Sequence, residues 1–139
     1  METILLNFEG YWMDIYKDEV PHEAGVYCVY ACESMAANKI AVLRELIYVG
    51  AADDVAACIA DHEKLVEWKE RLGEEETLCY SFANVNSDVR SRVEGAMVDH
   101  HRPPCNRIEE EVFPFDDTRL SIVGEHELLD DSFVVCAEK

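Results

Sequence analysis

Basic residues are scarce in this chain of 139 residues, which has 12 lysines and arginines against 30 aspartates and glutamates. The formal net charge is therefore −18 at pH 7. Proteins that bind nucleic acids neutralise phosphates with Lys and Arg, and this contribution dominates their affinity. The composition disfavours DNA as a partner unless a cation intervenes, and it is compatible with a basic protein partner.

Two further features are missing: a long apolar run and a closely spaced cysteine pair. No apolar stretch approaches the roughly 20 residues that a membrane helix needs. The first six residues have no basic stretch before their apolar residues, so we expect no signal peptide. The six cysteines form no C-x-x-C pair and are expected to be reduced thiols. These absences predict a cytoplasmic protein without a membrane partner, and they leave its oligomeric state open.

The acidity is uneven along the chain. Residues 108–139 carry ten acidic and two basic side chains, whereas residues 81–107 have four arginines against three acids. We expect one domain over 1–139, with a core at 21–107 and an acidic C-terminal extension at 108–139 packed on or beside that core. Such an extension could bind a basic partner or imitate nucleic acid.

Apolar patterns predict the elements of this core. Segments rich in β-branched and aromatic residues predict strands at 25–32, 41–49 and 77–82. Helical spacing predicts helices at 54–63, 61–72 and 87–101, with Asp53 or Asp54 as the first cap. Two short strands could follow at 119–123 and 132–136, while Trp12 and Tyr16 are spaced like one helical face. This order predicts an α+β fold: a small, mainly antiparallel three-stranded central sheet flanked by helices, with N- and C-terminal additions.

Three motifs follow one another in the core. Gly25-Val26-Tyr27 opens the first strand and Tyr48-Val49-Gly50 ends the second. Glu94 lies in the last helix of the core, ahead of a Pro-Pro-x-Asn turn that ends at Asn106. If the first two strands pair, Tyr27 and Tyr48 come together near one end of the sheet. In order and spacing, residues 25–106 resemble the GIY-YIG nuclease domain.

The resemblance implies a metal-dependent endonuclease that hydrolyses phosphodiester bonds in DNA. In that family the tyrosines that match Tyr27 and Tyr48 lie beside the attacking water and the scissile phosphate, and one is proposed to help deprotonate the water. Glu94 matches the glutamate that binds the single divalent metal, which would be Mg²⁺ or Mn²⁺. Asn106 matches an asparagine that braces the site, and His62 matches a histidine often found in the helix after the second motif.

One position departs from the family pattern. Counted from the second motif, the family arginine falls on Cys58, which cannot replace a guanidinium. An arginine of this kind can be worth several orders of magnitude in the rate of phosphoryl transfer. The resemblance therefore implies a nuclease-like domain with impaired hydrolysis. The alternative is a non-catalytic acidic interaction or regulatory module on the same scaffold, without a cofactor. Whether the protein is an enzyme stays open at this point.

Each of these residues also has an ordinary structural interpretation. Arg90 lies four residues before Glu94 on one helical face, so it could reach a phosphate bound there or form a surface ion pair. Both tyrosines could belong to the core, with satisfied hydroxyls. Gly25 and Gly50 are expected to be structural residues of the site.

A zinc site is the remaining hypothesis from the residue pattern. Cys58 and His62 have the i,i+4 spacing of two metal ligands on a helix, and His100, His101 and Cys105 are further candidates. No second pair with metal spacing is anchored to the first, so the pattern argues against zinc. We expect Cys58 to pack as a small hydrophobe and His62 to cap a helix C-terminus.

Overall fold

The computed structural model describes residues 1–33, 42–106 and 113–137. Along the chain the elements are β1 (Glu2–Met13), the 3-10 helix η1 (Asp14–Glu19), β2 (Gly25–Glu33), β3 (Val42–Ala52), α1 (Val55–Ala60), α2 (Leu65–Glu70), β4 (Glu76–Asn84), α3 (Ser87–His101), β5 (Thr118–Gly124) and β6 (Ser132–Val135). The expected boundary between core and extension, at 107 and 108, lies outside the described residues. No helix of the described part is long and apolar enough to cross a membrane.

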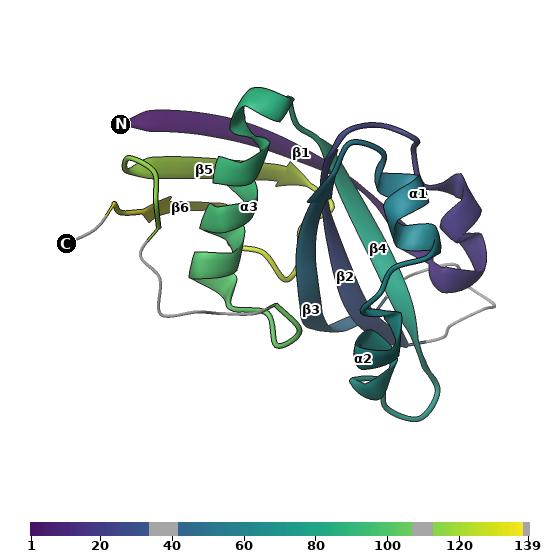
Figure 1. Cartoon of the computed structure of the whole chain (residues 1–139). Coiled ribbons are helices and arrows are strands. Elements are labelled where there is room, and N and C mark those ends of the chain that lie inside the picture. Colours follow the sequence, from purple (N-terminus) through teal and green to yellow (C-terminus); the bar gives the residue numbers. More distant parts are fainter. Residues whose placement is uncertain (34–41, 107–112, 138–139) are drawn as a thin grey trace.

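The strands form one curled mixed sheet in the order β3-β2-β4-β1-β5-β6 (Figure 1). The prediction of a small three-stranded sheet flanked by helices is therefore wrong. The three predicted strands exist and are neighbours, as β3-β2-β4, but β1 pairs with the free edge of β4. An uncovered edge presents unpaired N–H and C=O groups, and β1 satisfies those of β4. The predicted short strands at 119–123 and 132–136 are confirmed as β5 and β6, and they extend the same sheet.

Strand β1 joins two parts of this sheet. Residues 9–13 pair antiparallel with β4, and residues 2–8 pair parallel with β5. The change of partner falls between Phe8 and Glu9, just before Gly10, where φ is +156° and after which the register with β4 shifts. A Cβ at this position would lie 3.0 Å from the carbonyl oxygen of Tyr80, so the bend requires glycine. We call β3-β2-β4 the β2 half of the sheet, and residues 2–8 with β5 and β6 the β5 half.

Helix α3 covers one face of both halves. Its buried residues Val93, Ala96 and Met97 belong to a single apolar cluster with residues of β2 and β5. Among the described elements, η1, α1 and α2 cover the other face, and they lie over the β2 half (Figure 1). Strand β2 is consequently buried from Gly25 to Cys32, which explains its continuous apolar sequence.

The helical predictions hold in part. Asp54 caps α1, because its carboxylate accepts a hydrogen bond of 3.0 Å from the Ala57 amide. The predicted helix over 61–72 is shorter, since α2 covers only Leu65–Glu70, and α3 begins and ends as predicted. Trp12 lies in β1 rather than on a helix, so the helical spacing of Trp12 and Tyr16 was misleading.

Candidate functional site

Tyr27 and Tyr48 meet at one end of the β2 half. Their ring centroids are 6.1 Å apart, and β2 and β3 are antiparallel neighbours, as expected. The register between these strands shifts at Ile47, which is the mark of a β-bulge. The bulge lets Ile47 and Tyr48 both contact the cluster beneath α1 and α2. Tyr48 is thereby turned toward Tyr27.

Gly50 makes room for Tyr27. The two residues are partners across the β2–β3 ladder, and a Cβ on residue 50 would lie 2.4 Å from the Tyr27 hydroxyl oxygen. Gly25 is restricted in the same way, because a Cβ there would lie 2.1 Å from the Ala83 carbonyl oxygen. Neither position tolerates a side chain in this packing, so both glycines are structural residues of the site.

Cys58 of α1 closes over Tyr27. Its Sγ lies 3.5 Å from the Tyr27 hydroxyl, and Tyr27 is only 1% exposed. Burial, followed by the bond to Cys58, raises the pKa of Tyr27 far above its usual value, so the phenol stays protonated at neutral pH. Cys58 also packs against the cluster under α1, as expected for a small hydrophobe.

The ring of His62 is surrounded by the aromatic rings of Tyr27, Tyr48 and Trp68. Its ring centroid is 4.4 Å from that of Trp68 and 5.4 Å from that of Tyr48. Burial lowers its pKa, which favours the neutral imidazole. Nδ1 accepts a hydrogen bond of 3.0 Å from the Lys64 amide, so the neutral ring carries its proton on Nε2. Instead of capping a helix C-terminus, His62 positions an N–H donor beside the tyrosines.

Lys64 brings a cation that the motif comparison missed. Its Nζ lies 5.7 Å from the centroid of the Tyr48 ring and donates a 3.3 Å hydrogen bond to the Cys105 carbonyl oxygen. Trp68 was not predicted as a site residue either, and its ring centroid lies 5.3 Å from that of Tyr48. The proximity of Lys64 to Tyr48 depends on the tight connection between α1 and α2, which no spacing rule reveals.

Glu94 approaches the tyrosines from α3. Burial raises the pKa of its carboxyl group above the usual value, and the nearby Ala51 backbone opposes that shift. Its charge in turn contributes to the raised pKa values of Tyr27 and Tyr48, the latter reaching about 12. The structure therefore brings Tyr27 and Tyr48 side by side, and Glu94 lies close enough for its charge to raise the pKa of both.

Arg90 pairs with Asp53 rather than with Glu94. Its positive charge still lowers the pKa of Glu94, against the opposite effect of burial. One guanidinium nitrogen, Nη1, is buried without a hydrogen-bond partner among the described residues. Arg90 is thus a second cation near the site, held by an acid on the loop after β3.

Asn106 braces β3 beside Tyr48. Its Oδ1 accepts from the Val49 amide at 2.9 Å, and its Nδ2 donates to the Val49 carbonyl oxygen at 2.8 Å. The neighbouring Cys105 amide donates to the Ile47 carbonyl oxygen at 3.0 Å. The segment after α3 therefore acts as a short substitute strand along the edge of β3.

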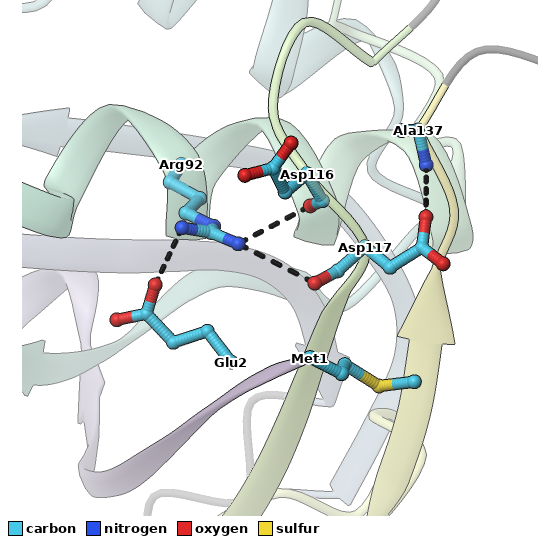
Figure 2. A pocket seen from close by; sticks show the side chains of 6 residues that line it. All are labelled: Met1, Glu2, Arg92, Asp116, Asp117 and Ala137. Carbon is cyan, nitrogen blue, oxygen red and sulfur yellow. Dashed lines mark hydrogen bonds and ion pairs between the residues drawn. The ribbon is translucent and has the colours of Figure 1, made fainter.

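A separate concavity of about 440 Å³ lies at the start of β1 (Figure 2). Its charged centre is Arg92 of α3, which donates to the Glu2 carboxylate and to the Thr118 hydroxyl. The same guanidinium reaches the carbonyl oxygens of Asp116 and Asp117 at 3.2 and 3.4 Å. Its donors are committed to the protein, so this pocket offers no ready anion site.

Comparisons with protein-family models, with curated proteins and with solved structures gave no match. The functional interpretation therefore depends on the geometry of the chain itself.

Proposed function

We propose that this protein is a GIY-YIG-type phosphodiesterase domain whose site binds a divalent cation and a phosphodiester but hydrolyses the ester poorly. The main support for this proposal is the contact between Cys58 and Tyr27. Motif counting assigns the family arginine to position 58, and in the fold this position lies 3.5 Å from the hydroxyl of the first-motif tyrosine. A contact between these two positions supports the motif alignment.

The residues at this end of the sheet fit such a ligand in chemical type. Glu94 offers a carboxylate, which is a ligand that suits Mg²⁺ or Mn²⁺, and the half-buried Tyr48 offers a hydroxyl group that can donate to a phosphate. A bound cation would offset negative charge on the phosphate oxygens. In this proposal the Nε2 proton of His62 and the ammonium of Lys64, whose side chains lie near Tyr48, donate to the phosphate.

Three features weaken hydrolysis at this site. The thiol of Cys58 stands where a guanidinium would stabilise the transition state. The pKa of Tyr27 is raised, so its phenol does not act as a base at neutral pH. The net charge of −18 also repels a polyanion at long range. Lys64 and Arg90 are the positive charges near the site, but they compensate for the missing arginine only in part, because Lys64 bonds to the Cys105 carbonyl oxygen and Arg90 pairs with Asp53.

Restoring the missing cation tests the proposal. We expect Cys58→Arg to raise cleavage of nicked and branched DNA by about 1000-fold in Mg²⁺ or Mn²⁺, the lower end of the effect of arginines in phosphoryl transfer. Single-turnover gel assays measure the rate. Cys58→Met is the matched control, because it lengthens the side chain without adding charge. The double variant Cys58→Arg with Glu94→Gln should return to background.

Metal binding is measured first, by calorimetry on the parent and on Glu94→Gln. We expect Mn²⁺ binding that Glu94→Gln weakens at least tenfold, since the carboxylate is the charged ligand. Cleavage by Cys58→Arg that stays at background, together with Mn²⁺ binding indifferent to Glu94→Gln, would overturn the proposal.

A non-catalytic acidic interaction module is the second candidate. Two features favour it: Tyr27 is buried, so its hydroxyl is not accessible to a substrate, and the protein has a net charge of −18. Such a module would bind a lysine-rich peptide with an affinity that falls steeply with added salt, and Glu94→Gln would not change that affinity.

A further inference from the structure

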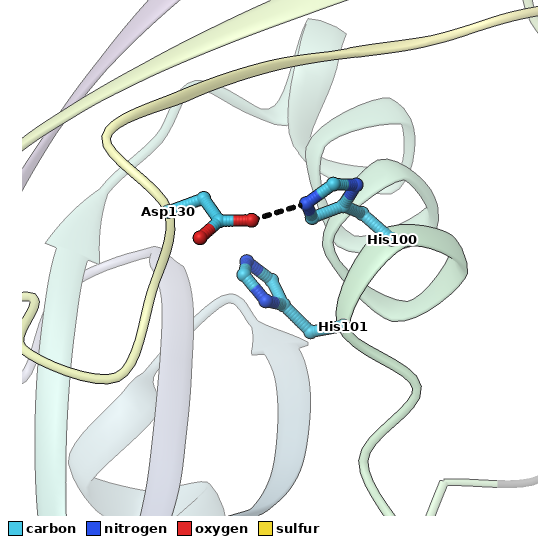
Figure 3. A group of neighbouring side chains, drawn as sticks. All are labelled: His100, His101 and Asp130. Carbon is cyan, nitrogen blue, oxygen red and sulfur yellow. Dashed lines mark hydrogen bonds and ion pairs between the residues drawn. The ribbon is translucent and has the colours of Figure 1, made fainter.

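A second set of ligand atoms lies at the C-terminal end of α3, away from the tyrosines. His100 and His101 are the last two residues of the helix, and Asp130 belongs to the loop between β5 and β6. One ligand atom from each residue lies within 4.8 Å of the other two. Figure 3 shows the two rings and the carboxylate converging on one point. Residues separated by 29 positions or more in sequence are thus brought together by β6 packing against α3.

The His100–Asp130 ion pair by itself does not explain this arrangement. His100 Nε2 lies 2.7 Å from Asp130 Oδ2, which satisfies one ring and one oxygen. His101 turns its ring toward the same carboxylate, yet its Nε2 is buried without a hydrogen-bond partner among the described residues. A buried polar nitrogen without a partner is unfavourable and calls for an explanation, such as a bound ion.

Phe133 of β6 holds both imidazoles in place. Its ring stacks on His100 with centroids 3.9 Å apart and an interplanar angle of 7°. The ring of His101 meets the same phenyl group edge-on, at 5.1 Å and 84°. A ligand set with rings fixed in this way loses little conformational freedom when an ion binds.

We propose that His100, His101 and Asp130 form a binding site for a divalent transition metal of the zinc class. Two imidazoles and one carboxylate are a donor set that Zn²⁺ uses with water in the fourth position. Tetrahedral Zn²⁺ places its ligand atoms about 3.4 Å apart, so atoms within 4.8 Å need only small side-chain rotations. Mg²⁺ and Ca²⁺ prefer oxygen ligands, so this site should select against them.

The ion would join α3 to the β5–β6 loop. Asp130 is largely exposed, with 67% of its side chain accessible, which leaves an entry path to the site. The site lies about 9 Å further along α3 than Glu94, at roughly 1.5 Å per residue. The two sites therefore differ in both position and donor type, with oxygen ligands at one and mainly nitrogen ligands at the other.

The chain contains its own matched control. His126 and Asp131 form a pair of the same kind, with Nε2 and Oδ1 2.6 Å apart, but no third ligand completes a group with them in the described part of the chain. Substitutions there change a histidine and an aspartate of the same β5–β6 loop that do not belong to the proposed ligand group. Cys136 needs a separate control, because it is an exposed thiol that could take up Zn²⁺.

The test is a Zn²⁺ titration of the full untagged chain under reducing conditions, by competition with a chromogenic chelator, with Co²⁺ absorption as a report of geometry. We expect one equivalent to bind, with affinity weakened at least about tenfold in His101→Gln and in Asp130→Asn. His126→Gln, Asp131→Asn, Cys136→Ser and Glu94→Gln should bind like the parent. Bound Co²⁺ should give the intense visible bands of a four-coordinate ion.

Three results would overturn the site: no binding in the parent at millimolar Zn²⁺, equal affinity in the parent and in both site variants, or loss of binding in Cys136→Ser. If His101→Gln does not fold, Asp130→Asn decides the question, because Asp130 is an exposed loop residue. A thermal-shift series at increasing Zn²⁺ gives an independent readout, since only a protein that binds the ion gains stability with its concentration.

Discussion

The β2 half and the β5 half of the sheet bury their side chains in different ways. In the β2 half, α3 covers one face and η1, α1 and α2 cover the other, so β2 is buried along both faces. In the β5 half the described residues cover only the α3 face, and side chains alternate between buried and exposed along β5 and β6. Leu5, in the part of β1 that belongs to this half, is 68% exposed.

The difference explains where the tyrosine site is built. Side chains covered on both faces are fixed by packing on two sides, which holds a ligand set more precisely than an open surface does. Tyr27 comes from the face under α1 and α2, and Glu94 comes from the helix on the opposite face. The charge of Glu94 nevertheless contributes to the raised pKa values of Tyr27 and Tyr48. The zinc-class site lies where α3 meets the one-sided half, and there a loop must supply Asp130.

The largest expected effect tests the two-sided packing. Trp68 is fully buried, so Trp68→Ala should lower the free energy of unfolding by about 3–5 kcal/mol. Trp68→Phe should cost clearly less, because Nε1 of Trp68 has no hydrogen-bond partner in the described part of the chain. Leu5→Ala in the one-sided half should stay within about 0.5 kcal/mol. Urea unfolding measures all three, and similar losses for Trp68→Ala and Leu5→Ala would break the comparison.

A smaller effect is expected at the edge of β3. Asn106→Ala removes both bonds to Val49 and should cost about 1–3 kcal/mol, since it leaves a backbone N–H and C=O unpaired. Asn106→Asp keeps an acceptor for the Val49 amide but loses the donor to its carbonyl, so it should also destabilise the protein. Amide hydrogen exchange should locate the loss at residues 47–50. Unchanged protection there would contradict a bracing role for Asn106.

The smallest effect has the opposite sign. Burial raises the folded-state pKa of Glu94, so this residue favours folding below the unfolded-state pKa and loses that contribution as pH rises through the folded-state pKa. At pH 7–8 the ionised carboxylate is therefore unfavourable, and Glu94→Gln should stabilise the protein by about 0.5–2 kcal/mol. The gain should shrink as pH falls toward 4. Thermal unfolding across this range checks the sign, and a variant less stable than the parent at pH 8 would contradict it.

Local elements were largely predictable because their determinants are local. Asp54 caps α1 through a residue three positions away. Gly25 and Gly50, by contrast, exclude a side chain because of Ala83 and Tyr27 on neighbouring strands, so only the tertiary structure shows why they must be glycine. The segment from Gly25 to Cys32 is apolar because helices cover both faces of this strand. Patterns of this kind repeat within one element, so they can be recognised without knowing what packs against it.

The size of the sheet was not predictable in this way. The segment 2–13 mixes apolar and acidic residues, and its role depends on an uncovered edge of β4 and on β5 from the far end of the chain. Pairing between distant strands leaves no local signal in either one. The prediction of three strands failed for this reason, although five of the six strands had been recognised one by one.

By itself the sequence determined the local elements, the acidic character and the order of Tyr27, Tyr48 and Glu94 along the chain. Tertiary structure decided which side chains meet: Cys58 with Tyr27, Lys64 with Tyr48, and Asp130 with His100 and His101. The reason is physical. Propensity and periodicity act over a few residues, whereas a binding site depends on distances set by the twist of a sheet and the packing of helices on it.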